Sequence, residues 1–149
     1  IADADIVTVG GTKNGMLFGD AVLVRKPEHF RGIHFVQKQI GHLASKHRYV
    51  AAQFLAFLQG DLWLDTAAHA NAMARRLSDG MAALGLRLAS PVEANEVFVA
   101  LEADVRRALA QSYLVHQPDL AEPTVRFVCS WSTLDSDVDA LLATLRELL

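Results

Sequence analysis

Hydrophobic and polar positions follow two different periods along the first sixty residues of this chain. Residues 4–9 (ADIVTV) and 21–25 (AVLVR) are short apolar runs without a polar face, a pattern typical of strands covered on both sides. Over 38–58 the apolar residues recur every three or four positions, which is the period of one helical face. The pattern predicts two strands of a layered α/β sheet, followed by one helix over 38–58.

A second long helix is predicted over 61–85. Gly60 interrupts the first helical pattern, and Gly85 supplies a stop at the end of the second. Between these glycines, apolar residues recur every seven positions at Trp63, Ala70, Leu77 and Leu84. We therefore expect a long helix that links two lobes.

The chain after Gly85 consists of shorter predicted elements. These are strand-like segments at 86–90 and 96–101, a helix over 103–112, a possible strand near Leu114, a strand at 124–130 and a final helix. The final helix has one apolar stripe, formed by Val138, Leu141, Leu142, Leu145 and Leu149. Asp135, Asp137 and Asp139 lie near the positive end of its dipole. This order favours a small α+β lobe in which the final helix packs on an antiparallel sheet.

Composition narrows the class of protein. The 149 residues are 52% hydrophobic with a mean hydropathy of +0.21, enough for a sizeable core. The formal net charge is −3 and there is no basic stripe, so we expect no nucleic-acid partner. No apolar run approaches the roughly 18 residues that span a bilayer, and we expect no membrane association.

The single cysteine, Cys129, cannot form an internal disulfide, and a buried thiol in a reducing compartment is the simplest interpretation. We therefore expect a cytoplasmic protein. The sequence opens with Ile1 rather than methionine, and strand-like residues begin almost at once. This start suggests that the chain is a fragment of a longer protein.

One lysine, Lys13, stands in the glycine-rich turn between the first two predicted strands. A phosphate-binding P-loop is excluded because no Ser or Thr follows Lys13 and the next element is a strand, not a helix. A second interpretation is a solvated loop lysine that takes no part in function. The third is a lysine that forms a Schiff base with an aldehyde cofactor. The residues by themselves leave the last two interpretations open.

Several segments in the same order resemble one enzyme family. They are VTVGGTKNG, KQIGHLASKHRYVAAQ, HANAMARRL, PVEANEVF and VRFVCSWST. Together they look like the C-terminal half of the threonine aldolase and β-eliminating lyase family, with the strongest likeness to its phenylserine aldolase branch. The resemblance runs from about residue 3 to residue 149. It implies pyridoxal 5'-phosphate (PLP) as cofactor and the aspartate-aminotransferase-like fold.

The fold implied by the resemblance is an α/β fold with three parts. Residues 1–60 would be the C-terminal part of the large PLP-binding domain, with the end of its sheet. Residues 61–85 would be the linking helix, and residues 86–149 the small α+β C-terminal domain.

The resemblance also assigns site residues. Lys13 matches the lysine that binds the cofactor, and Thr8 and Thr12 are near enough to offer hydroxyls to its phosphate. Arg126 matches the arginine that grips the substrate carboxylate, since a guanidinium forms two parallel hydrogen bonds with such a group. Lys38 matches a residue near the cofactor, although Gln37 stands where the family usually has an arginine.

Other candidate chemistry is weaker. The histidines at 34, 42, 47 and 69 lack the spacing of a metal site, so we assign no metal. Ser45 and Ser130 have no nucleophile-elbow motif, and Cys129 lacks the electropositive setting of a reactive thiol. We expect these three residues to be structural.

By resemblance, the intact protein would be a lyase that cleaves β-hydroxy-α-amino acids such as threonine or phenylserine to glycine and an aldehyde. The family places its other cofactor groups before the lysine, so this chain would need the missing N-terminal half of the same protein and would be inactive alone. A homo-oligomer, dimer or tetramer, is expected. The alternative is a non-catalytic interaction or structural domain derived from the same fold.

Overall fold

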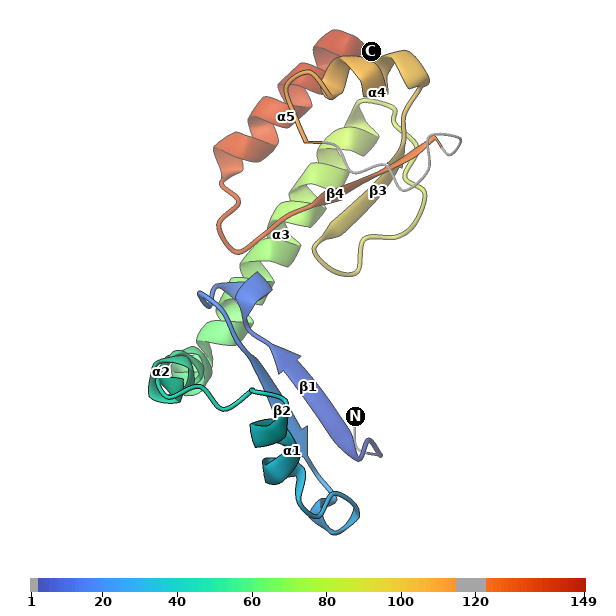
Figure 1. The fold of residues 1–149 in the computed structure, drawn as a ribbon. Helices are drawn as coiled ribbons and strands as arrows, with labels where there is room; N and C mark the ends of the chain where they lie inside the picture. The colour runs from blue at the N-terminus through green and yellow to red at the C-terminus, as the bar shows by residue number, and fades with distance from the viewer. Residues whose placement is uncertain (1–2, 115–122) are drawn as a thin grey trace. The chain divides into compact units, whose positions relative to one another are not determined.

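The computed structural model describes residues 3–114 and 123–149. The chain divides into two compact units, Ile1–Trp63 and Leu64–Leu149, and each unit contains its own two-stranded antiparallel sheet (Figure 1). The three-part division into 1–60, 61–85 and 86–149 stays a prediction.

The first unit is built around β1 (Ile6–Gly10) and β2 (Asp20–Val24). The strands pair antiparallel, with Thr8 opposite Val22, so the two predicted strands form a hairpin. A one-turn 3-10 helix, η1 (Thr12–Asn14), lies between them. The expectation that these strands are covered on both faces is wrong for this chain, because Val22 and Leu23 are both exposed.

The single helix predicted over 38–58 is wrong, because the structure has two helices there. They are α1 (Ile33–Gln39) and α2 (His47–Leu58), preceded by the short η2 (Pro27–His29). Gly41 adopts a left-handed φ of 76°, and the amides of Gly41 and His42 bond back to the carbonyls of Lys38 and Gln37. This is a Schellman motif, which ends α1 whatever apolar period continues beyond it.

The second long helix is confirmed. After η3 (Gln59–Asp61), α3 runs over Leu62–Ala83. Gly60 and Gly85 at its two ends both have left-handed backbones, with φ of 61° and 81°. The two glycines read from the sequence therefore mark real ends of helical structure.

The second unit contains β3 (Glu96–Ala100), α4 (Ala103–Leu109), β4 (Thr124–Val128) and α5 (Asp135–Leu148), together with nearly all of α3. β3 and β4 pair antiparallel with Phe98 opposite Arg126, as predicted for the small lobe. In the 86–90 segment, Leu88 makes a single bridge to Val99. Leu114 is not in a strand, and residues 115–122 lie outside the described residues.

One face of the β3–β4 sheet carries the core of the second unit. Val97, Val99 and Val125 are fully buried there. They pack in one cluster with side chains of α3, α4 and α5, including Met81, Leu109 and Leu145. The opposite face, with Glu96, Phe98 and Arg126, is half-buried.

The final helix packs as its stripe predicted. Val138, Leu141 and Leu145 are buried in the core of the second unit, whereas Leu149 lies beyond the helix and is exposed. The Asp137 carboxylate accepts a hydrogen bond from the Leu134 amide at 2.9 Å, which caps the helix. Arg76 of α3 pairs with Asp139 and Asp135, and the Asp139 hydrogen bond and charge raise the pKa of the Arg76 guanidinium.

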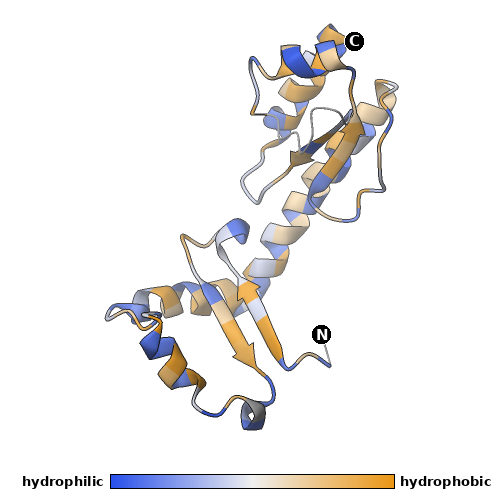
Figure 2. Ribbon diagram, turned by 45° about the vertical axis from the view of Figure 1, so that its right-hand side comes forward, coloured by the Kyte–Doolittle hydropathy of each residue, from blue (hydrophilic) through white to orange (hydrophobic). Residues whose placement is uncertain are grey.

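The two units bury very different amounts of apolar surface. Among the described side chains of the first unit, only Met16 and Phe57 are buried hydrophobics. Many others stay exposed, and Figure 2 shows hydrophobic colour along its strands and helices. The most exposed include Leu17, Phe35, Ile40 and Leu55. Within the described residues, no helix is long and apolar enough to cross a bilayer.

Candidate active site

Lys13 lies in η1, at the tip of the β1–β2 hairpin. Its side chain is exposed and makes no hydrogen bond or ion pair with any residue that the structure describes. Only the unprotonated amine of a lysine attacks a carbonyl group, so exposure gives this side chain access to an aldehyde but does not by itself activate it. The side chain is therefore available for the chemistry that the sequence assigned to it.

Besides its backbone hydrogen bonds, the turn around this lysine is held by three hydrogen bonds that involve side chains of the first unit. The Gly19 amide donates to the Thr12 hydroxyl at 3.1 Å, and the Leu17 amide donates to Gln53 Oε1 of α2 at 2.9 Å. The Asn14 side-chain amide donates to the carbonyl of Trp63 at 2.9 Å. The turn is thus tied both to α2 and to the start of α3.

Two glycines allow the turn to take this shape. Gly15 closes η1 with a left-handed φ of 109°, which L-residues with a Cβ rarely adopt. A Cβ on Gly19 would come within 2.9 Å of Val50 on α2. The loop after Lys13 therefore packs closely on α2, and a larger residue at 19 would push it away.

Thr8 and Thr12 are placed in the same unit as Lys13. Thr8 lies in β1 and its side chain is exposed. The Thr12 hydroxyl accepts the Gly19 amide and keeps its own proton to donate. Two hydroxyls and one amine of suitable chemistry for a phosphorylated aldehyde such as PLP thus lie in one unit, and their role in binding it stays a prediction.

The sequence predicted that Lys38 begins a long helix. In the structure Lys38 lies in the last turn of α1 instead. Its side chain is exposed. A cation at this end complements the helix dipole, which is a sufficient structural role. Its assignment to substrate binding stays a prediction.

Arg126 lies in β4 in the second unit, so the structure does not bring it into one unit with Lys13. Its Nη1 atom pairs with Glu96 Oε1 of β3 at 3.3 Å. Its Nε atom is buried and has no hydrogen-bond partner among the described residues. The Arg126 side chain as a whole is 37% exposed, so an added carboxylate would bind the guanidinium at its exposed edge and not at the buried Nε.

Glu96 is the residue that sequence reasoning missed. Strand alternation places Glu96 and Phe98 on one face, but only the register with β4 brings Glu96 beside Arg126. No signal in the sequence gave that register. Pairing of Glu96 and Arg126 therefore became visible only in the structure.

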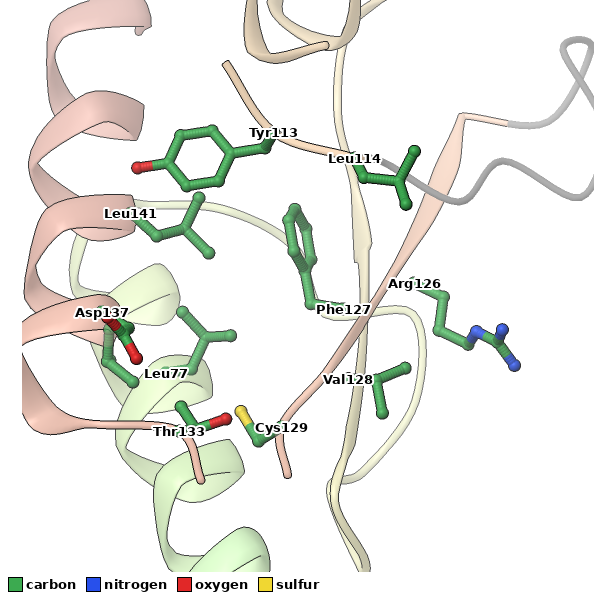
Figure 3. Close-up of a pocket in the computed structure, with 11 residues that line it drawn as sticks. Leu77, Tyr113, Leu114, Arg126, Phe127, Val128, Cys129, Thr133, Asp137 and Leu141 are labelled. Carbon is green, nitrogen blue, oxygen red and sulfur yellow. The ribbon is translucent and has the colours of Figure 1, made fainter. Parts of the chain in front are cut away.

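A cavity of about 340 Å³ lies beside β4 within the second unit, and Arg126 is one of its lining residues. Figure 3 shows Phe127 and Cys129 on the side of α3 and α5, while Arg126 extends in the opposite direction. Leu77, Tyr113 and Leu141 also line the cavity. Burial raises the pKa of the Cys129 thiol, so this group stays neutral and unreactive near pH 7.

The described residues contain no cluster of three His, Cys, Asp or Glu side chains suited to a metal ion. The chemistry of the candidate site therefore rests on one amine, two hydroxyls and a guanidinium. The groups lie on two separate units, with Lys13 in one and Arg126 in the other.

Comparison with solved structures defines the class of protein. The chain superposes on the Leishmania major threonine aldolase with a TM-score of 0.88 and 28% identity, covering 97% of this chain and 43% of that one. For the serine palmitoyltransferase of Sphingomonas wittichii the TM-score is 0.72 at 20% identity, covering 99% and 40%. The fold is that of part of a PLP-dependent, aspartate-aminotransferase-like enzyme.

Sequence comparison finds similar proteins among the threonine aldolases. The low specificity L-threonine aldolase of Pseudomonas aeruginosa is 38% identical over 148 residues, which is 99% of this chain and 42% of the relative. The chain is a homologue of the threonine aldolases along its length. It spans less than half the length of the curated relatives it matches. No family model matches the chain.

Proposed function

We propose that this chain is part of a PLP-dependent aldolase that cleaves β-hydroxy-α-amino acids such as threonine or phenylserine to glycine and an aldehyde. The observation that carries the proposal is Lys13. Its amine has no partner among the described residues, and it stands on a turn held by hydrogen bonds to α2 and to the start of α3, in a chain similar to threonine aldolases. An unpaired lysine on a fixed backbone is the arrangement that a cofactor aldehyde requires.

Each assigned residue has a distinct role in this proposal. Lys13 holds the cofactor through its amine, and Thr8 and Thr12 donate hydrogen bonds to the phosphate. Arg126 binds the substrate carboxylate and so fixes the orientation of the amino acid. When bound, PLP supplies a sink for the electron pair released as the Cα–Cβ bond breaks.

The apolar surface of the first unit supports a further part of the proposal. Relatives of this chain are more than twice its length. Val22, Leu23 and Phe35 are exposed on β2 and α1, in a unit that buries only Met16 and Phe57 among its described hydrophobic side chains. We infer that the N-terminal part of a threonine aldolase covers this surface and completes the β1–β2 sheet. The oligomeric state and the cytoplasmic location stay predictions.

A chimera tests the activity. Residues 1–149 replace the homologous 42% of the P. aeruginosa threonine aldolase. With PLP present, the chimera is expected to release glycine from L-threonine. Lys13→Ala is expected to lower kcat by at least about 1000-fold, because the covalent attachment point is lost.

Lys46→Ala is the matched control, since Lys46 is also an exposed lysine of the first unit and has no assigned role. It is expected to keep the activity of the unaltered chimera. A folded chimera that binds no PLP and releases no glycine would favour the alternative, a non-catalytic interaction domain. Full activity in Lys13→Ala would also contradict the proposal.

A further inference from the structure

We propose that Glu96 is a positioning residue for Arg126, and that it leaves the outer Nη1–Nη2 edge of the guanidinium for the substrate carboxylate. This inference rests on the proposed function, and it concerns residues of the second unit only. Nothing in the sequence motifs pointed to Glu96. The argument comes from the register of the β3–β4 sheet and from the atoms that the ion pair occupies.

The sheet register makes Glu96 and Arg126 diagonal neighbours. Arg126 stands directly opposite Phe98, and Glu96 precedes Phe98 by two residues. The three side chains therefore share the face of the sheet that is turned away from the core. Because both strands are anchored by buried valines on the other face, the two charged groups are presented on a fixed backbone.

The ion pair occupies one of the three nitrogens of the guanidinium. Glu96 Oε1 accepts from Nη1 at 3.3 Å, whereas Nε is buried and lacks an acceptor among the described residues. A planar carboxylate binds two neighbouring nitrogens of an arginine at once. Nη1 carries two hydrogens, so one stays free when Glu96 accepts the other, and with Nε buried the pair left for a second carboxylate is Nη1 and Nη2.

The ion pair is a poor candidate for a purely stabilising role. Both side chains are more than one-third exposed, at 37% and 38%, and exposed ion pairs contribute little to stability. The core of the unit lies on the opposite face of the sheet. Loss of Glu96 should therefore change carboxylate binding much more than folding.

Kinetics of the chimera provide the first test. Glu96→Gln keeps the shape of the side chain and removes its charge, so the guanidinium loses its fixed orientation. We expect KM for L-threonine to rise about tenfold, equivalent to ~1.4 kcal/mol, with little change in kcat. KM for threoninol, which has a hydroxymethyl group in place of the carboxylate, should not change. Glu96→Asp keeps the negative charge on a shorter side chain, so its KM for L-threonine should lie between those of the unaltered chimera and Glu96→Gln.

Glu93→Gln is the matched control, because Glu93 is an exposed glutamate just before β3. It should behave like the unaltered chimera. A KM for L-threonine in Glu96→Gln that is unchanged or lower would overturn the inference, and a lower value would show that Glu96 competes with the substrate. If Arg126→Lys also leaves KM unchanged, the role of Arg126 itself is wrong.

A second test does not depend on activity. In the 149-residue chain, the Nε–H signal of Arg126 can be assigned by NMR from its loss in Arg126→Lys. Titration with N-acetylglycine is expected to shift this signal in the unaltered chain, and to shift it less in Glu96→Gln. Equal shifts in both would overturn the inference, as would no shift. Failure of the proposed function appears separately, as a chimera that binds no PLP while this titration still succeeds.

Discussion

Lys13 and Cys129 show how burial decides which nucleophilic group of this chain is available. The Lys13 amine is exposed and has no partner in the described structure. The Cys129 thiol is only 3% exposed, and its pKa is raised by burial. Of the two groups, only the amine combines access with a fixed backbone.

The raised pKa of Cys129 predicts a pH dependence of stability. A group whose pKa is raised on folding contributes stability below its unfolded pKa, and this contribution is lost as the pH rises through the folded pKa. The unfolded thiol titrates at roughly 8.5. The free energy of unfolding should therefore fall more between pH 7 and pH 10 in the unaltered chain than in Cys129→Ala. Urea unfolding at both pH values measures this. An equal fall in the free energy of unfolding in the two proteins would contradict the prediction.

Single residues were predictable where the sequence carries a local signal. The glycines around Lys13 indicated a turn between the first two predicted strands, and the structure has η1 there. The partner of Arg126 was not predictable, because it depends on the register between strands 30 residues apart. Contacts such as Asn14 to Trp63 are likewise set by tertiary structure.

Gly80 of α3 lies close to Leu142 of α5. A Cβ at this position would lie 2.3 Å from Leu142 Cδ1 and 3.1 Å from its Cγ. Gly80→Ala gains about 1 kcal/mol of helix propensity, but overpacking costs about 1–3 kcal/mol. We expect a net loss of about 1 kcal/mol in the free energy of unfolding.

A double-mutant cycle isolates the steric cause. In the Leu142→Ala background the clash is absent, so Gly80→Ala should become stabilising by up to about 1 kcal/mol. Urea unfolding of the four proteins gives the coupling energy. The same loss in both backgrounds would mean that Gly80 is needed for some reason other than close packing.

The elements were predictable where the glycines that end helices and the spacing of the apolar residues agreed. Gly60 and Gly85 mark the two ends of the α3 region, and the apolar stripe of α5 faces the core. They disagreed over 38–58, where the apolar period continues through Gly41 but the Schellman motif ends α1. Ile40 and Leu43, which carried that period, are exposed. A glycine at a helix end outweighed the hydrophobic pattern.

The two units should differ in stability as whole bodies. The core cluster lies in the second unit, whereas the first unit buries only Met16 and Phe57 among its described hydrophobic side chains. Since apolar burial is the main stabilising term, amides of β1, β2 and α2 should exchange with solvent faster than those of β3, β4 and α5. Hydrogen exchange of the 149-residue chain measures this.

Equal protection in the two units would contradict the burial argument. In the chimera, protection of β1 and β2 should increase by at least about tenfold, because the N-terminal part of the aldolase is proposed to cover them. Protection of β3 and β4 serves as the internal control and should change less. If protection of β1 and β2 does not increase, the proposal that the N-terminal part of the aldolase covers them is contradicted.

At this scale the sequence predicted the class of fold well, because several motifs in a fixed order identify a family. The homology to threonine aldolases and the superposition on the L. major enzyme confirm that class. The exposed strands of the first unit were not predicted, since an apolar run has the same composition whether its covering layer belongs to the same segment or to another.

The central claim is that Lys13 is the residue that binds PLP. The most direct measurement is reduction of the PLP-loaded chimera with borohydride, followed by digestion and mass spectrometry of the pyridoxyl-labelled peptide. The account predicts a single label on Lys13, which is lost in Lys13→Ala and kept in Lys46→Ala. A label on any other lysine, or a chimera that cleaves threonine without a label on Lys13, would contradict it.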